Sequence, residues 1–348
     1  MSNKSPFFIL SAKKWSNYFP LQVVYEWEEI ISEKLDIPID YDSQIVANEL
    51  FDKKLNNQAQ KIIRRTFLQK HIDSSFNYFK KNKKGKYMLS FLLNPIAISN
   101  HYIYQENSVV ILLDVFKSNI DLIPKWFKNK LIFVTNIEVL DYFKAHPIAG
   151  KLHYIPLSIS DKYYSGHIPA KKIDVLQMGR QNPVLHEWML TVTNKYPEIE
   201  YVYAKNVDGI NVYYSTTKGV LTDKTGTRQE FMDFLGSAKI SLLSAPGVDG
   251  GDQLRTGGFN PVTPRFYESA VKYCYMIGRY PDAPDFILNK VSSVCERPAN
   301  YQDFEQMVLR MLNTPFDLKE QYDAYIKQHL TSTIADSIKV ELDKLICS

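Results

Sequence analysis

Apolar runs of strand length alternate with longer helical patterns from one end of the chain to the other. Parallel strands need a long crossover connection, usually a helix, so this alternation predicts an α/β fold with largely parallel sheets covered on both faces. The strand-like runs are residues 7–10, 87–93, 109–113, 131–134, 152–155, 173–178, 199–203, 240–243 and 275–278, with weaker runs at 37–40 and 212–214. Helical patterns are expected near residues 23–34, 44–80, 138–145, 183–196, 229–237, 303–313 and 317–346.

The chain is long enough for two hydrophobic cores. Its 348 residues exceed the usual size of one domain, and residues 156–169 hold two prolines, three serines and a glycine without a long periodic pattern. This segment is the best linker in the sequence. We therefore expect an N-terminal domain over residues 1–165 and a C-terminal domain over 166–325, followed by a helix at 326–348 that packs back toward the first domain.

The composition is that of a folded protein with an ordinary soluble surface. Hydrophobic residues make up 45% of the chain, and the net charge of +4 is too small an excess to indicate nucleic-acid binding. The three cysteines have no metal-like spacing, which argues against a disulfide framework and a zinc site. No apolar window is long enough for a signal peptide or a transmembrane helix, so we expect a cytoplasmic protein, at most peripheral to the membrane.

One local cluster of charge is strong. Five lysines lie within residues 80–86, and Lys125, Lys128 and Lys130 follow on a later helical stretch. The cluster is either a solvated loop or a face attracted to anionic lipid or to a lipid-diphosphate acceptor. Because residues 80–86 contain only Lys, Asn and Gly, with no aromatic residue among the lysines, nucleic acid is the least favoured partner.

A helix start with the features of an anion site follows the glycine-rich loop 245–259. Thr263 and Pro264 open an amphipathic pattern, and proline suits the first helical turn because its missing N–H has no helical partner to lose. The free N–H groups and the positive end of the helix dipole attract anions such as phosphate. Arg265 adds a charge, and Glu268, one turn later, can accept hydrogen bonds from a ribose diol. The segment is either a nucleotide site or an ordinary capped helix with a solvated glutamate.

The Thr-Pro-Arg-x-x-Glu run at 263–268 resembles the donor-binding motif of bacterial members of the glycosyltransferase group 1 superfamily, which have the GT-B fold. The resemblance implies an α/β protein of two Rossmann-like domains facing a cleft, with the donor nucleotide bound by the second domain. In that pattern the glutamate at the place of Glu268 contacts the ribose. Many retaining members carry another glutamate eight positions earlier, where this chain has Asn260.

The resemblance extends to the start of the second domain. Gly179 and Arg180 follow the predicted strand 173–178, and in the superfamily this arginine often reaches the donor diphosphate with its planar fork. No lysine follows between residues 181 and 190, so Arg255 or Arg265 would complete the clamp. The implied donor-binding residues are Gly179, Arg180, Arg255, Asn260, Thr263, Arg265 and Glu268. Replacing Glu268 by alanine is expected to weaken nucleotide binding by about 1 to 3 kcal/mol and to leave the fold intact.

Two other classes of nucleotide protein are disfavoured. The glycine loop lacks the Gly-Lys-Ser/Thr ending of an ATPase loop, and no Gly-x-Gly-x-x-Gly follows the first strand of either half. Glycines let the backbone approach a pyrophosphate, whereas Asp249 and Asp252 are better placed to contact sugar hydroxyls. A mobile loop without a binding role is the alternative.

The implied reaction is displacement at the anomeric carbon of a UDP- or GDP-type sugar, with no separate cofactor. Fixed N–H groups and arginines would stabilise the leaving diphosphate in place of a metal ion. An inverting reaction would need a base on the acceptor side, for which Asp114, at a strand end, is the leading candidate, followed by His146 and His101.

By analogy, the acceptor is a bacterial surface glycan such as O-antigen or capsule on a lipid carrier. The alternative is a GT-B-like protein that binds a nucleotide sugar or glycan without transferring it.

Overall fold

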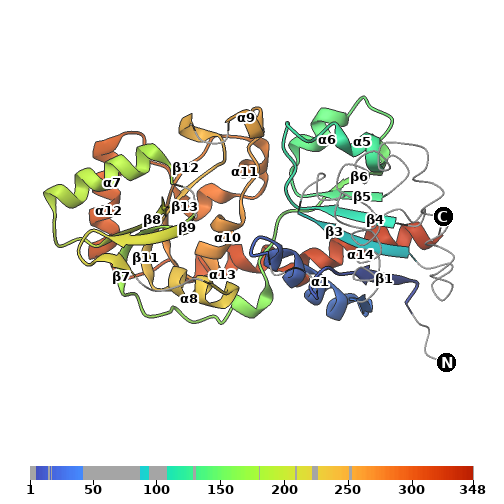
Figure 1. The fold of residues 1–348 in the computed structure, drawn as a ribbon, viewed down its shortest axis with the longest axis horizontal. Helices are drawn as coiled ribbons and strands as arrows, with labels where there is room; N and C mark the ends of the chain where they lie inside the picture. Colours follow the sequence, from blue (N-terminus) through green and yellow to red (C-terminus); the bar gives the residue numbers. More distant parts are fainter. Residues whose placement is uncertain are drawn as a thin grey trace. The chain divides into compact units, whose positions relative to one another are not determined.

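The structure is a computed structural model of the chain. It describes all residues except 1–4, 15, 17, 42–86, 94–107, 128–130, 180, 208–209, 222–225, 251–252 and 348. The predicted helical stretch 44–80 and the lysine cluster 80–86 therefore lie outside the described residues, as do Lys128 and Lys130. Figure 1 shows the course of the chain and the element labels used below.

The chain divides into two compact units. The first comprises residues 1–155 and 335–348, and the second comprises residues 156–334. The sequence analysis set the boundary ten residues later, at 165/166. The last helix, α14 (Thr331–Cys347), begins in the second unit, and its residues from 335 onward belong to the first.

The first unit contains a six-stranded sheet in which each neighbouring pair is parallel, with the order β2-β1-β3-β4-β5-β6. Its central strands β1, β3, β4 and β5 are buried on both faces, as expected for parallel strands between helices. They are β1 (Phe7–Leu10), β2 (Ile39–Asp40), β3 (Tyr87–Leu92), β4 (Ser108–Leu112), β5 (Leu131–Val134) and β6 (Leu152–Tyr154). The helices within the described residues of this unit are α1 (Leu21–Leu35), α5 (Leu122–Phe127) and α6 (Glu138–Phe143), with a 3₁₀ turn, η3 (Ala149–Lys151).

The second unit contains a seven-stranded sheet with the order β10-β9-β8-β7-β11-β12-β13. Five strands are parallel, and β9 and β10 form an antiparallel edge. The strands are β7 (Ile173–Gln177), β8 (Tyr201–Val207), β9 (Ile210–Ser215), β10 (Gly219–Leu221), β11 (Ala238–Ser244), β12 (Tyr275–Arg279) and β13 (Cys295–Glu296).

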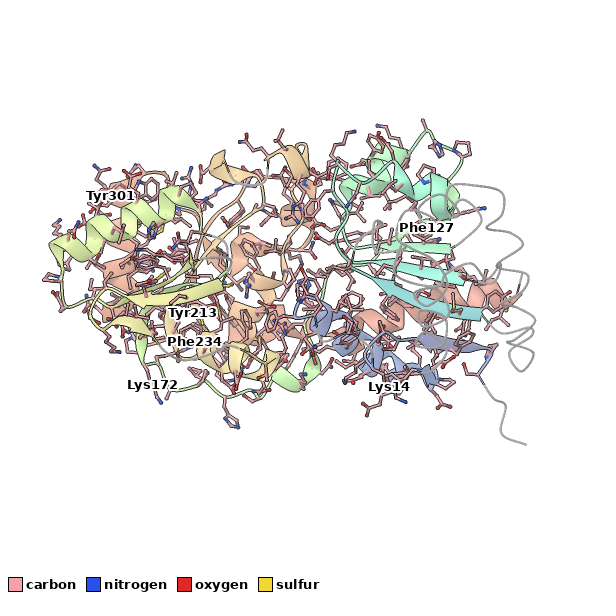
Figure 2. The ribbon with its side chains drawn as sticks, viewed as in Figure 1. Lys14, Phe127, Lys172, Tyr213, Phe234 and Tyr301 are labelled. Atoms are coloured by element: carbon pink, nitrogen blue, oxygen red, sulfur yellow. The ribbon has the colours of Figure 1, made fainter. Side chains whose placement is uncertain are left out.

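Helices cover both faces of this sheet (Figure 1). On one face, α7 and α12 pack on a core that includes Val175, Leu185, Ile240 and Phe304. On the other face, the ring of Phe234 on α8 lies 5.1 Å from the ring of Tyr213 on β9, and both are labelled in Figure 2. The helices are α7 (Pro183–Lys195), α8 (Arg228–Gly236), α9 (Gln253–Thr256), α10 (Pro264–Val271), α11 (Pro284–Leu288), α12 (Tyr301–Asn313) and α13 (Lys319–Gln328). Three 3₁₀ turns, η4 (Asp161–Tyr163), η5 (Val248–Gly250) and η6 (Val291–Ser293), complete the described elements of the unit.

These two sheets confirm the predicted α/β class with two Rossmann-like units. Each strand-like run of the sequence forms a strand, in most cases within one residue of the expected bounds. The pattern at 317–346 is not one helix but two, because the chain turns at His329 between α13 and α14. The short strands β10 and β13 were not predicted, since neither exceeds three residues.

Candidate functional site

The order in which the chain adds strands to the second sheet reverses at β7. From β7 the chain passes through α7 to β8 on one side, whereas β11 lies on the other side of β7. In open α/β sheets, ligands bind outside the carboxyl ends of the strands at such a switch point, because the loops there part in opposite directions. The residues that follow β7 and β11 therefore mark the candidate site.

Helix α10 begins near this edge. Its N-cap, Thr263, is extended, with φ −92° and ψ 159°, and its side chain makes no capping hydrogen bond, while Pro264 fills the first helical position. The preceding residue is anchored, since the Val262 N–H donates to the buried Asp285 carboxylate at 2.7 Å. The start of α10 is thus held in place from outside the helix, which leaves its first turn to serve an anion.

Arg265 in this first turn lies against Gly179, directly beyond β7. A Cβ atom on residue 179 would lie 2.9 Å from Arg265 Nη2, and Gly179 has a φ of +79°. The positive φ favours glycine at residue 179, and a larger residue there would push the Arg265 guanidinium aside. The Arg265 side chain is 31% exposed, so its guanidinium can reach a ligand.

Glu268 is not a solvated glutamate. Its side chain is 2% exposed, and its carboxylate accepts from Arg228 Nη1 at 2.6 Å and from Arg265 Nη1 at 3.2 Å. The sequence analysis did not single out Arg228, which is only 7% exposed. We refer to Arg228, Arg265 and Glu268 as the Arg–Glu–Arg cluster.

This burial argues against the expectation that Glu268 can be removed without harm to the fold. Its loss would leave Arg228, a buried cation, without this carboxylate, and breaking a buried ion pair destabilises a protein strongly.

Aromatic rings hold the two guanidinium groups. The Cζ atoms of Arg265 and Arg228 lie 4.4 and 5.2 Å from the centroid of the Phe231 ring, and Arg228 Cζ lies 5.7 Å from that of Tyr163. Such stacking favours cations, guanidinium groups in particular. The cluster is therefore fixed by packing as well as by charge.

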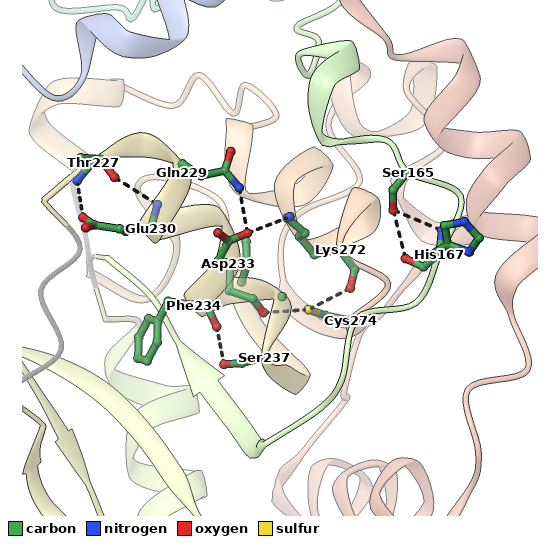
Figure 3. A network of polar contacts seen from close by, with 12 residues as sticks. Ser165, His167, Thr227, Gln229, Glu230, Asp233, Phe234, Ser237, Lys272 and Cys274 are labelled. Atoms are coloured by element: carbon green, nitrogen blue, oxygen red, sulfur yellow. Dashed lines mark hydrogen bonds and ion pairs between the residues drawn. The ribbon is translucent and has the colours of Figure 1, made fainter.

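Helix α8 places Arg228 beside α10. A capping box starts α8, in which Thr227 Oγ1 accepts from the Glu230 N–H and the Glu230 carboxylate accepts from the Thr227 N–H. Five residues after Arg228, Asp233 pairs with Lys272 at the end of α10 at 3.5 Å (Figure 3). The two helices are thus tied together at both ends of the contact.

The glycine loop after β11 is folded onto the same edge of the sheet. Asp249, at φ 56°, forms a two-pronged ion pair with Arg279 at the end of β12, with 2.7 Å between Arg279 Nη2 and Asp249 Oδ1. Its Oδ2 also accepts from Asn182 Nδ2 at 2.8 Å. The Arg279 guanidinium holds the pKa of Asp249 below its usual range. The sequence analysis gave this carboxylate to sugar hydroxyls; in the structure it ties the loop to β12 and to the start of α7.

Of the other predicted donor-binding residues, Arg255 lies on the glycine loop and Asn260 directly follows it. Arg255 is exposed on α9, and the Asn260 side chain donates to the Gly258 carbonyl at 2.7 Å. Arg180 and Asp252 lie outside the described residues. The structure thus brings Gly179, Arg265 and Glu268 together.

In the first unit, Asp114 is half-buried two residues beyond β4. The switch point of this sheet, however, lies between β1 and β3, because β2 and β3 flank β1. His146 is exposed after α6, where its Nδ1 accepts from the Ile148 N–H at 3.2 Å, and His101 lies outside the described residues.

The sequence analysis missed a buried polar pair, Ser11 and Glu28, at the carboxyl end of β1. Ser11, fully buried directly after β1, donates to the carboxylate of Glu28 on α1. Burial raises the pKa of Glu28 to about 8, although the hydrogen bond from Ser11 opposes the shift. The signal was present in the sequence, because Glu28 continues the helical stripe of Leu21, Val24 and Ile31.

Two kinds of site are not found in the part of the chain that the structure describes. No group of three or more His, Cys, Asp or Glu side chains there could hold a metal ion. No helix there is both long and apolar enough to cross a bilayer.

The chain shows low similarity to solved glycosyltransferases. It aligns with a crystal structure of a GtfA/B complex at 8% identity and a TM-score of 0.44, covering 75% of this chain and 58% of that one. For a mutant TarM of S. aureus in complex with fondaparinux, alpha-GlcNAc-glycerol and UDP, identity is 12%, TM-score 0.45, and coverage 72% and 54%. For CalG4, the calicheamicin glycosyltransferase, identity is 9%, TM-score 0.39, and coverage 97% and 96%.

The chain spans little more than half the length of the first two of these proteins. No protein-family model matches its sequence, and no curated protein does. Function must be decided by the residues of the site.

Proposed function

We propose that this protein is a glycosyltransferase of the GT-B type, which binds a nucleotide-diphospho sugar at the carboxyl ends of β7 and β11 and transfers the sugar to a glycan. The observation that carries the proposal is the position of Arg265. It stands in the first turn of α10, against Gly179 at the sheet's switch point, and Glu268 holds it there. A diphosphate can be bound by the N–H groups of a helix start, by a guanidinium group fixed beside them, and by a glycine whose backbone can approach the phosphates closely.

The chemistry follows from the leaving group. As the bond between the anomeric carbon and the diphosphate oxygen breaks, negative charge grows on that oxygen. N–H groups of the α10 start and the Arg265 guanidinium are fixed before reaction, so they stabilise this charge without reorganisation. In this proposal the cations of the protein take the place of a metal ion.

Glu268 then has two tasks. It fixes Arg265. The ribose contact is proposed from the motif alone, since the Glu268 side chain is 2% exposed and each of its oxygens already pairs with an arginine. The remaining donor contacts are proposed from the same resemblance: Arg180, Arg255, Asn260 and Thr263.

The acceptor side belongs to the first unit in this proposal. Asp114 is the proposed base of an inverting reaction, with His146 as the alternative. The proposed acceptor is a bacterial surface glycan, O-antigen or capsule, on a lipid carrier at the inner face of the membrane. That assignment is an analogy with the superfamily that the motif resembles.

The test is donor turnover. Purified protein is incubated with a panel of UDP- and GDP-sugars, and released nucleoside diphosphate is read by a luminescent assay; UDP-sugars come first, since the TarM complex contains UDP. We expect release above the enzyme-free rate, and its loss in Arg265→Gln. Binding of nucleoside diphosphate without any release would favour the alternative, a non-catalytic binding protein, to which the asparagine at residue 260 points. If the protein shows no binding of nucleoside diphosphate and no release, both the transferase and the binding-protein proposals are contradicted.

A further inference from the structure

We infer that Arg228 is a positioning residue of the diphosphate site, which orients Arg265 through the shared carboxylate of Glu268. The inference rests on the proposed function for the identity of the anion. It adds a residue that the donor motif does not contain.

Arg228 occupies a place that is unfavourable for a cation. It is the first residue of α8, directly after the N-cap Thr227. The helix dipole is positive at this end and favours anions, so a buried guanidinium here opposes it. Residues that violate a local rule while the fold around them is well formed are expected at functional sites. A leucine or methionine would satisfy the packing of this position without the charge.

The geometry shows what this unfavourable charge achieves. Arg228 Nη1 contacts Glu268 Oε1 at 2.6 Å, and Arg265 Nη1 contacts the other oxygen, Oε2, at 3.2 Å. The carboxylate is planar, so fixing one oxygen fixes the direction in which the other accepts. The shorter contact is the buried one, and the longer contact is to the arginine that solvent reaches. Arg228 therefore sets the carboxylate, and the carboxylate sets Arg265.

The ring of Phe231 supports the same arrangement. Both guanidinium groups lie over it, Arg265 at 4.4 Å and Arg228 at 5.2 Å from the centroid. The ring and the carboxylate of Glu268 thus hold Arg265 from two sides. A guanidinium held in this way can present its remaining N–H groups as a fork to two phosphate oxygens.

The test uses pyrophosphate as the probe, because it carries the diphosphate without base, ribose or sugar. Calorimetry compares the wild type with Arg228→Lys, Arg265→Gln and the double variant. Lysine keeps a charge that can pair with Glu268, but its ammonium lacks the flat guanidinium that lies over Phe231 while holding Glu268 Oε1 in one direction. We expect Arg228→Lys alone to weaken pyrophosphate binding by about tenfold or more, because Glu268 no longer holds Arg265 in one orientation and the charge-assisted contact of Arg265 to the anion is weakened.

The double variant separates positioning from general structural damage. Because Arg228 acts through Arg265, Arg228→Lys should have little further effect in the Arg265→Gln background. The matched control is Arg310→Lys, at an arginine 54% exposed and paired with Glu296, which should leave pyrophosphate affinity unchanged. Far-UV circular dichroism and melting of each variant identify loss of fold.

Two results would overturn the inference. One is unchanged pyrophosphate affinity in Arg228→Lys; the other is that Arg228→Lys lowers this affinity by the same factor in the wild-type and Arg265→Gln backgrounds. If the wild type binds pyrophosphate but neither UDP nor GDP, the inference is tested as before and the proposed function fails. If pyrophosphate itself does not bind, the inference fails as well.

Discussion

Replacing Glu268 by glutamine should destabilise the second unit by about 3 to 5 kcal/mol, the range for removing one partner of a buried ion pair. The magnitude follows from burial. Arg228 is 7% exposed and Glu268 2%, so water cannot replace the lost carboxylate at Arg228. Arg265, at 31% exposure, is partly solvated and adds little. Glutamine keeps the shape and one acceptor oxygen, so the loss measures charge rather than a cavity.

The assay must report on the second unit, because a chain with two units need not unfold in one step. Native-state hydrogen exchange in low denaturant, read on peptides that cover α10, gives the opening free energy of that region. The control is Glu296→Gln, the same substitution opposite an arginine, in a pair with both side chains exposed at 39% and 54%. It should cost less than about 1 kcal/mol.

A second variant tests the reason for the loss. Adding Arg228→Met to Glu268→Gln removes the buried cation that has lost its Glu268 carboxylate, so it should restore part of the stability. The reasoning is refuted if Glu268→Gln costs no more than the Glu296 control. It is also refuted if the added methionine makes the loss larger.

The remaining predictions concern four other sites. Glu28→Gln should change the pH dependence of stability. The folded-state pKa of Glu28 is raised to about 8, so the stability of the wild type falls as pH rises from about 4.5 to about 8, and the variant should gain a few kcal/mol relative to wild type over that range. Parallel pH profiles of urea unfolding for the two proteins would contradict this. Gly179→Ala should weaken nucleoside-diphosphate binding in calorimetry by about tenfold or more, because its methyl group displaces the Arg265 guanidinium and the backbone is strained; undiminished affinity would count against that contact. Asp249→Asn should release the glycine loop, seen as faster hydrogen exchange in peptides over residues 245–259, with exchange in α12 unchanged as control; equal loop exchange would show that the ion pair does not hold the loop. Asp114→Asn should lower transfer by about a hundredfold with donor affinity preserved, whereas a normal rate would mean a retaining reaction or a base elsewhere.

Much of the fold could be predicted from the sequence, because burial on both faces gives each parallel strand a continuous apolar run. The run 240–243 became the centre of β11, and 275–278 became β12. Short strands carry no such signal: β13 has two residues and pairs only at the edge of the sheet. The break between α13 and α14 was missed because both helices share one apolar period across His329.

The candidate site was predictable only in part. Thr263 and Pro264 mark a helix start, which depends on neighbouring residues and can therefore be predicted from the sequence. The partner of Glu268 comes from α8, about forty residues earlier, and no spacing rule connects the two. A capping box at Thr227 and Glu230 could have placed Arg228 at the helix start, where its charge is out of place. Burial of Glu268 could not have been read from its motif.

The most direct test of the account is a crystal structure of the protein with UDP or GDP. The account predicts that the β-phosphate lies within hydrogen-bonding distance of the Arg265 guanidinium and of N–H groups in the first turn of α10, beside Gly179. A nucleotide bound with its phosphates away from the α10 start, or bound in another part of the chain, would contradict it.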